Sequence, residues 1–178
     1  MQDGQAALIS AASRTLRRYM ELCDVPAVAY DREELRALFA PDAVWEGAGK
    51  WNAERFGRVS GADRIVEMLE TRLPPNPHFT LNAHLLGRGT LKPCGGSGTG
   101  VEGQWPMVRL STYTAGGANI TLTELRVWFE ADRDRALITE YRPRRLWSQA
   151  LDPEQARALA FVLGVDTETT HTSTRRAM

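Results

Sequence analysis

The sequence lacks the features that mark membrane, secreted and nucleic-acid-binding proteins. No apolar run approaches the roughly 18 residues that a membrane helix needs. The first five residues have neither the basic start nor the apolar centre of a secretory signal. Lys+Arg and Asp+Glu number 22 each, and no basic stripe stands out, so nucleic acid is not an expected partner. We expect a soluble, cytoplasmic protein that binds neither membranes nor nucleic acid.

Cysteine is also scarce, and the two residues present, Cys23 and Cys94, form no motif, which suits a reducing compartment. The glycine-rich stretch at 95–100 leads into a strand pattern rather than a helix, so we predict a hairpin loop and not a phosphate-binding loop. His78 and His84 are roughly 20 Å apart along an extended strand, too far to share one zinc ion. We therefore expect no metal and no cofactor, which leaves acid–base chemistry if the protein is an enzyme.

The hydrophobic periodicity changes along the chain from helical to extended. Helices are predicted at 7–23, 31–40, 60–73 and 153–163, the last with Asp152 as its N-cap. Strands are predicted at 43–45, 78–87, 104–114, 119–130 and 136–142. The pattern predicts an α+β fold in which N-terminal helices pack on a strongly curved antiparallel sheet that forms a cone-shaped pocket. A single domain is expected over residues 1–165, followed by a disordered polar tail at 166–178.

Two features of the pattern offer candidate chemical groups. Asp24 ends the first predicted helix, where it is either a general base or an ordinary solvated helix end. Strict alternation places His78, Thr80, Asn82 and His84 on one face of the following long strand. That polar face either is solvated or lines the pocket, and histidine is the side chain best suited to exchange a proton near neutral pH.

A third group lies on the next two strands, around Arg109, Tyr113 and Glu124. Glu124 interrupts an apolar run and has arginine neighbours, so two interpretations are open. The first is a cross-strand ion pair, and the second is a carboxylate that lines the pocket.

Several local sequences resemble those of one superfamily. They are Arg18-Tyr19 with Asp24 five residues past the tyrosine, Leu38-Phe39-Ala40-Pro41-Asp42-Ala43-Val44-Trp45-Glu46-Gly47, Gly57-Arg58-Val59-Ser60-Gly61 and His78-Phe79-Thr80-Leu81-Asn82. Over residues 8–146 the chain resembles the SnoaL-like branch of the nuclear transport factor 2-like superfamily. That branch includes polyketide cyclases, scytalone dehydratase and ketosteroid isomerase. The resemblance implies a cystatin-like α+β barrel and is weaker evidence for the type of reaction.

The resemblance also implies roles for individual residues. In the dehydratase-like members, an aspartate at the end of the first helix and a histidine at the start of a long strand form an acid–base pair, and Asp24 and His78 fall on those positions. Asp31 competes for the aspartate position and is interpreted as the cap of the second helix. The implied substrate-binding residues are Tyr19, Trp45, Asn82, Arg109, Tyr113 and Glu124.

We therefore expect a dehydratase, cyclase or isomerase that acts on a hydrophobic small molecule without a cofactor. The alternatives are a non-catalytic ligand-binding domain and an accessory subunit like the small subunit of ring-hydroxylating dioxygenases, which the resemblance also includes. A homodimer formed through the outer face of the sheet is expected, because apolar residues occur on both faces of the strands, as at Val108 and Leu125.

Overall fold

A computed structural model of the chain describes residues 2–26, 30–74, 76, 78–94, 99–162 and 164. The helices are α1 (Gln2–Cys23), α2 (Arg32–Ala37), α3 (Gly49–Phe56), α4 (Ala62–Glu70) and α5 (Pro153–Val162). The strands are β1 (Phe39–Glu46), β2 (Arg58–Ser60), β3 (Phe79–Leu86), β4 (Thr90–Cys94), β5 (Gly100–Tyr113), β6 (Ala118–Asp132) and β7 (Arg135–Leu151). The expected tail at 166–178 and positions 95–98 of the glycine-rich stretch lie outside the described residues.

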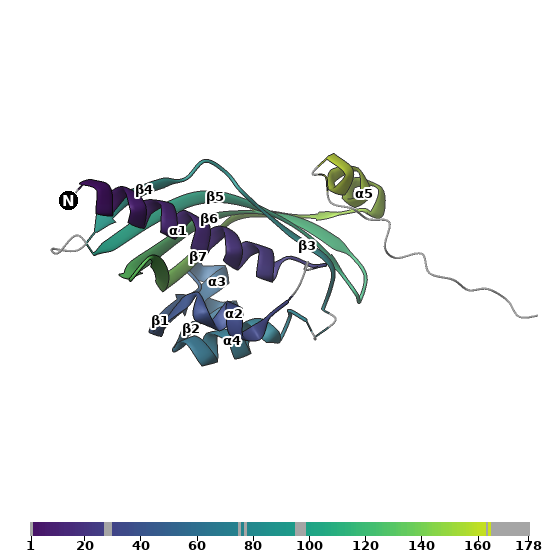
Figure 1. The fold of residues 1–178 in the computed structure, drawn as a ribbon. Helices are drawn as coiled ribbons and strands as arrows, with labels where there is room; N and C mark the ends of the chain where they lie inside the picture. The colour runs from purple at the N-terminus through teal and green to yellow at the C-terminus, as the bar shows by residue number, and fades with distance from the viewer. Residues whose placement is uncertain are drawn as a thin grey trace, which may run out of the picture.

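The strands form one seven-stranded sheet in the order β2-β1-β7-β6-β5-β3, with β4 paired to the first half of β5. The long strands β5, β6 and β7 pair antiparallel with one another, as the short turns between them predict. α1 lies across the sheet, α2, α3 and α4 lie around β1 and β2, and α5 lies at the far end of the long strands (Figure 1). The predicted α+β class is confirmed.

The structure differs from the prediction in several elements. β1 pairs with β7 in parallel, so the sheet is mixed rather than wholly antiparallel. This pairing joins strands that are about a hundred residues apart, and no local signal reports such a contact. β7 continues to Leu151 instead of ending at Arg142, and its register runs through Pro143, a residue type that usually interrupts a ladder. α3, β2 and β4 were not predicted.

α1 and α2 follow directly from the sequence. α1 buries a stripe of residues spaced three or four apart: Leu8, Ala12, Leu16, Tyr19 and Cys23. It ends before Pro26, which disfavours helical geometry in Val25. Asp31 is the N-cap of α2, because its side chain accepts a hydrogen bond of 3.0 Å from the backbone N–H of Glu34. This confirms the interpretation of Asp31 as a cap.

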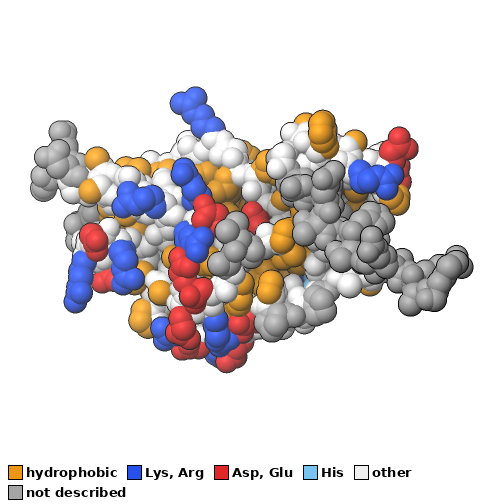
Figure 2. Space-filling model, turned by 45° about the vertical axis from the view of Figure 1, so that its right-hand side comes forward, with side chains coloured by type: hydrophobic (Ala, Val, Ile, Leu, Met, Phe, Trp, Pro, Cys, Tyr) orange, Lys and Arg blue, Asp and Glu red, His pale blue; other side chains and the backbone are white. Residues whose placement is uncertain are grey.

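The two faces of the sheet are covered differently. Odd-numbered residues of β5 and β6 face the helices, and α5 covers part of the opposite, outer face through contacts among Leu81, Leu110 and Ala160. Figure 2 shows acidic and basic side chains interspersed on one face of the molecule. Within the described residues, no helix combines the length and the apolar character needed to cross a bilayer.

Candidate functional site

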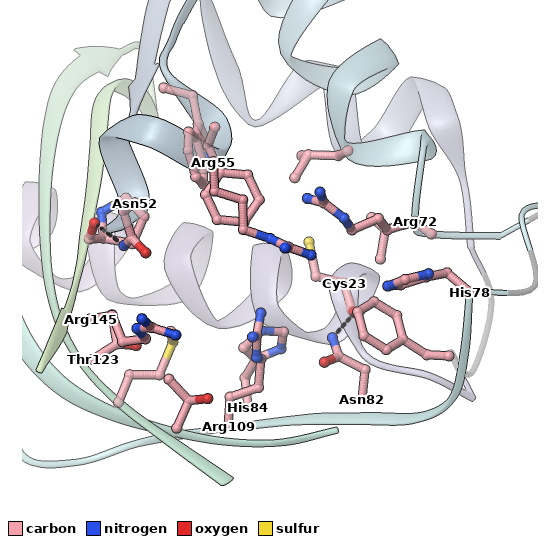
Figure 3. A pocket seen from close by; sticks show the side chains of 18 of the residues that line it. Cys23, Asn52, Arg55, Arg72, His78, Asn82, His84, Arg109, Thr123 and Arg145 are labelled. Atoms are coloured by element: carbon pink, nitrogen blue, oxygen red, sulfur yellow. Dashed lines mark hydrogen bonds between the residues drawn. The ribbon is translucent and has the colours of Figure 1, made fainter. Parts of the chain in front are cut away.

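A cavity of about 220 Å³ lies between the inner face of the sheet and the helices. Its aromatic lining consists of Tyr19, Trp45, Trp51, Phe56, Phe79, Tyr113 and Tyr141. Polar side chains reach it from α3, from the segment after α4, and from β3, β5, β6 and β7, and Figure 3 shows several of them pointing inward. An apolar wall with a few convergent polar groups is the usual character of a site for a small molecule.

Asp24 and His84 form the closest acid–base contact at this cavity. The Asp24 Oδ1 atom lies 2.7 Å from His84 Nδ1 and also accepts a hydrogen bond of 3.0 Å from the His84 backbone N–H. The His84 side chain is 10% exposed and lines the cavity, whereas Asp24 is not among the lining residues. Because Nδ1 contacts the carboxylate, Nε2 is the ring nitrogen left for a molecule in the cavity.

The backbone explains why these two side chains meet. Immediately after α1, Val25 forms an isolated antiparallel bridge with Asn82 of β3, through hydrogen bonds of 2.8 and 2.9 Å. In an antiparallel pairing the residue before Val25 lies beside the residues after Asn82, so Asp24 comes next to His84. The helix end is thereby attached to the strand at the position that brings the acid to the imidazole.

The side chain of Asn82 reinforces this attachment. It is buried, its Nδ2 donates a hydrogen bond of 3.0 Å to the carbonyl oxygen of Cys23, and its Oδ1 accepts one of 2.9 Å from the hydroxyl of Ser111. Buried polar groups that are satisfied in this way hold their neighbours in one arrangement. Asn82 also lines the cavity, so the predicted polar contact has a structural role as well.

The surroundings of His84 favour its neutral form. Burial lowers the pKa of His84 below its usual value of 6.5, the hydrogen bond and charge of Asp24 raise it, and the charge of Arg109 lowers it, with a net decrease. The neutral ring can donate its Nδ1 proton to Asp24 and accept a proton at Nε2. Burial also raises the pKa of the Cys23 thiol to about 12, so Cys23 is unsuited to act as a thiolate nucleophile.

The histidine in contact with Asp24 is thus His84 and not His78, which the sequence analysis expected to pair with it. His78 precedes β3 and lines the same cavity, but its ring packs against Phe79 and Tyr113, with centroids 4.5 and 5.4 Å away. The two histidines are six positions apart, which is roughly 20 Å of extended chain. Only one of them can therefore lie beside the end of α1.

Two β-bulges decide which side chains enter the cavity. The β3–β5 register shifts between Phe79 and Leu81, so Thr80 is exposed while Phe79 lines the cavity. The predicted strict alternation, which placed Thr80 with the histidines, is therefore wrong at that residue. A second shift, in the β6–β7 register, lets both Arg145 and Ser148 line the cavity although they are three residues apart. Bulges re-aim side chains in this way and are common beside functional sites.

The remaining predicted binding residues separate into two groups. Tyr19, Trp45, Arg109 and Tyr113 line the cavity. Glu124 does not line it, and its carboxylate forms ion pairs with Arg126 at 3.3 Å and Arg144 at 3.0 Å. As an even-numbered residue of β6 it lies on the outer face of the sheet, where the ion-pair interpretation applies.

The sequence interpretation missed three arginines that line the cavity, Arg55, Arg72 and Arg145. Arg55 lies on α3 and Arg145 on the part of β7 beyond its predicted end, so both depended on elements that were not recognised. Arg72 follows α4 directly. For metal binding, the described part of the chain contains no cluster of three or more His, Cys, Asp or Glu side chains.

Comparison with known proteins agrees with this architecture. The family described as the SnoaL-like domain matches residues 5–139. No curated protein matches significantly. The structure of LinA is similar with a TM-score of 0.69 and 14% identity, covering 86% of this chain and 96% of LinA.

Two further structures are similar over most of their length. A candidate scytalone dehydratase from Novosphingobium aromaticivorans has a TM-score of 0.68 and 17% identity, covering 85% of this chain and 93% of its own. The hexachlorocyclohexane dehydrochlorinase LinA-type3 from Novosphingobium barchaimii has a TM-score of 0.64 and 13% identity, covering 81% and 90%. At these identities the likeness shows the fold alone. Because the family match spans most of its length, the chain belongs to the SnoaL-like domain family.

Proposed function

We propose that the chain is a cofactor-independent lyase or isomerase in which His84 removes a proton from a carbon atom of a small molecule in the cavity. The observation that carries this proposal is the contact of 2.7 Å between Asp24 Oδ1 and Nδ1 of the cavity-lining His84, whose side chain is 10% exposed. A neutral imidazole held by a carboxylate on one nitrogen is a general base on the other. Asp24 orients the ring and stabilises the imidazolium that forms.

The proposed step leaves a negative charge on the substrate, which needs a nearby cation. Arg109 lies directly opposite His84 in the pairing of β3 with β5, and both side chains line the cavity. As His84 Nε2 takes the proton, the electron pair of the C–H bond remains on the substrate, where Arg109 stabilises it. In a lyase this pair then forms the new double bond, and the leaving group departs with its own bonding pair. In an isomerase the imidazolium returns the proton to another carbon.

The names of the similar structures support an elimination, since dehydrochlorinase and dehydratase both describe the loss of a small molecule from a substrate. His78, at the other end of the β3 segment, is proposed as a polar contact in the cavity wall and not as the partner of Asp24. Tyr19, Trp45 and Tyr113 supply the aromatic surface that holds the substrate.

The proposal can be tested with nitrobenzisoxazole, a small planar carbon acid. Removal of its C–H proton opens the ring: the C–H electron pair forms the nitrile, and the N–O bond breaks to give a coloured phenolate. We expect turnover by the wild type, and His84→Ala should lower kcat/KM by about 10²- to 10⁴-fold, the usual contribution of a general base. Added imidazole should restore part of the lost rate. Equal rates for folded His84→Ala and the wild type would disprove the proposal.

The second candidate, a ligand-binding domain without chemistry, is favoured by the apolar character of the cavity wall. A ligand-binding domain would use the same cavity, but the Asp24–His84 contact would have no role in it. It predicts that nitrobenzisoxazole quenches the fluorescence of the lining residues Trp45 and Trp51 on binding, with no protein-dependent ring opening. Absorbance and fluorescence recorded on the same samples separate the two candidates.

We also propose that the chain pairs with a second copy through the outer face of the sheet. Trp147 is 48% exposed there, and its chain neighbour Leu146 is 51% exposed. Across the strands, Trp147 lies opposite Leu122, and Leu122 lies opposite Val108, which gives a continuous apolar strip on that face. Exposed apolar strips of this kind are typical of protein interfaces.

A further inference from the structure

The cavity contains several cations and, among the described residues, no carboxylate in its lining. Arg55, Arg72, Arg109 and Arg145 all line it, from α3, the segment after α4, β5 and β7. No hydrogen bond or ion pair joins any of these four to another group in the described part of the chain. Figure 3 shows Arg55 and Arg72 extending into the same space, with His78 and Asn82 beside it.

This lack of partners is unusual for the chain. Four half-buried arginines lie outside the cavity, and each forms an ion pair with a carboxylate: Arg18 with Glu34, Arg32 with Glu70, Arg36 with Asp63 and Arg142 with Glu46. By contrast, the half-buried arginines of the cavity, Arg72, Arg109 and Arg145, have none. A charge that is partly removed from water without a partner is costly, so a persistent cluster of such charges indicates a ligand that supplies the counter-charge.

Arg109 shows this most directly. Its Nε atom is buried and has no hydrogen-bond partner. Its cross-strand neighbours in the sheet are His84 on one side and Thr121 on the other, neither of which is an anion. Guanidinium groups remain protonated in proteins, so Arg109 brings a full positive charge to the floor of the cavity.

Aromatic rings hold the other three guanidinium groups in place. The Arg145 guanidinium carbon lies 3.4 Å from the centre of the Trp51 ring, and that of Arg55 lies 5.4 Å from the same ring. The Arg72 guanidinium carbon lies 4.7 Å from the centre of the Phe56 ring. Stacking on a ring uses the flat face of a guanidinium and leaves its N–H edge free, and that edge matches the two oxygens of a carboxylate or phosphate.

The mutual repulsion of these charges is consistent with one shared site. Burial first, and then the charges of Arg55 and Arg109, lower the pKa of Arg72. Burial and the charge of Arg55 likewise lower the pKa of Arg145. An anion placed among the guanidinium groups removes this repulsion and gains charge-assisted hydrogen bonds.

We infer that the cavity takes an organic anion: a planar, apolar molecule that carries a carboxylate or another oxyanion held by the guanidinium groups of Arg55, Arg72, Arg109 and Arg145. The claim that this anion is the substrate on which His84 acts rests on the proposed function. The claim that the cavity binds such an anion rests only on the residues that line the cavity. The ring of such a molecule packs on the aromatic wall, and its anionic group lies on the arginine side of the cavity.

The test compares two probes of the same shape, naphthoate and the uncharged naphthamide, by calorimetry or by quenching of tryptophan fluorescence. Naphthoate should bind at least about tenfold more tightly, because a charge-assisted hydrogen bond exceeds a neutral one by about that factor. Arg72→Met and Arg145→Met should each weaken naphthoate binding about tenfold and leave naphthamide binding unchanged. The control is Arg64→Met, an exposed residue of α4 outside the cavity, which should change neither.

Equal affinities of the wild type for naphthoate and naphthamide would overturn the inference. So would a loss of naphthoate binding in Arg64→Met as large as that in Arg72→Met and Arg145→Met. Since Arg72 and Arg145 lie on different elements, misfolding of one variant leaves the other as a test. The outcome is also separable from the proposed function. If His84→Ala keeps the preference for naphthoate and the wild type fails to open nitrobenzisoxazole, only the catalytic proposal fails. If ring opening depends on His84 and naphthoate is not preferred, only the anion site fails.

Discussion

Replacing Asp24 by asparagine is the most direct test of the proposed mechanism, because it removes a charge and nearly preserves the shape of the side chain. The amide oxygen of asparagine can still accept the backbone N–H of His84, which Asp24 Oδ1 accepts at 3.0 Å. What is lost is the carboxylate beside His84 Nδ1. The ground state contains a neutral imidazole and is little affected, whereas the transition state contains a developing imidazolium and loses its counter-ion.

The expected size of the effect follows from that geometry. Opposite charges whose centres are about 4 Å apart interact by about 4 kcal/mol at the effective dielectric constant of about 20 that applies near protein surfaces. The Asp24 side chain is 33% exposed, so solvent screening reduces the contribution. A remaining contribution of about 3 kcal/mol corresponds to a roughly 100-fold decrease in kcat/KM.

The direction in which the pH profile of the activity moves in Asp24→Asn is an independent test of the mechanism. In the wild type the activity should fall as the pH drops through the lowered pKa of His84, below 6.5, because only the neutral ring accepts a proton. Asp24 raises the pKa of His84, so Asp24→Asn should lower it further and move the acid limb to a lower pH. Initial rates of nitrobenzisoxazole opening across this range measure both effects. The reasoning would be refuted if the plateau value of kcat/KM for Asp24→Asn were within about twofold of the wild-type value, or if its acid limb lay at higher pH than that of the wild type.

Four further outcomes are expected. Arg109→Met removes a cation that lowers the pKa of His84, so the acid limb and the NMR titration of the His84 ring should move to higher pH. His78→Ala should lower kcat/KM for nitrobenzisoxazole less than tenfold, far less than the loss expected for His84→Ala, and a larger loss would restore His78 as a proton-transfer group. Asn82→Ala deletes two buried hydrogen bonds and should lower the free energy of unfolding in urea by about 2–3 kcal/mol. Trp147→Glu places a charge on the exposed apolar strip and should convert a dimer to a monomer in light scattering, whereas an unchanged mass would locate the interface elsewhere.

Much of the fold could be predicted because it depends on local patterns. The apolar stripe of α1, the cap at Asp31 and the alternation in β5 and β6 are properties of contiguous residues, and the structure has them as expected. The parallel contact of β1 with β7 is different, since its partners lie about a hundred residues apart. α3 has no side-chain cap and buries little of its surface, so its eight residues carry a weak helical signal.

The candidate site divides in the same way. The sequence could point to Asp24 as a candidate site residue, because Asp24 stands at the end of a helix whose boundary Pro26 sets locally. Which histidine it meets depends on the bridge between Val25 and Asn82, a tertiary contact that fixes the position of the helix end along β3. A shift of a few residues in that bridge would select a different partner, so the choice between the two histidines requires the structure.

The distribution of charge around the cavity favours one class of intermediate over another. The carboxylate of Asp24 contacts the Nδ1 side of His84 and is not among the lining residues, while four arginines line the space itself. A carbanion or enolate formed when His84 takes a proton is therefore surrounded by cations, and at close range each of them stabilises it. The same four positive charges would repel and destabilise a carbocation. On the proposed function, the reaction should then begin with loss of a proton rather than with departure of the leaving group. A substrate deuterated at the reacting carbon should consequently show a primary isotope effect, and replacing its leaving group by a better one should change the rate much less.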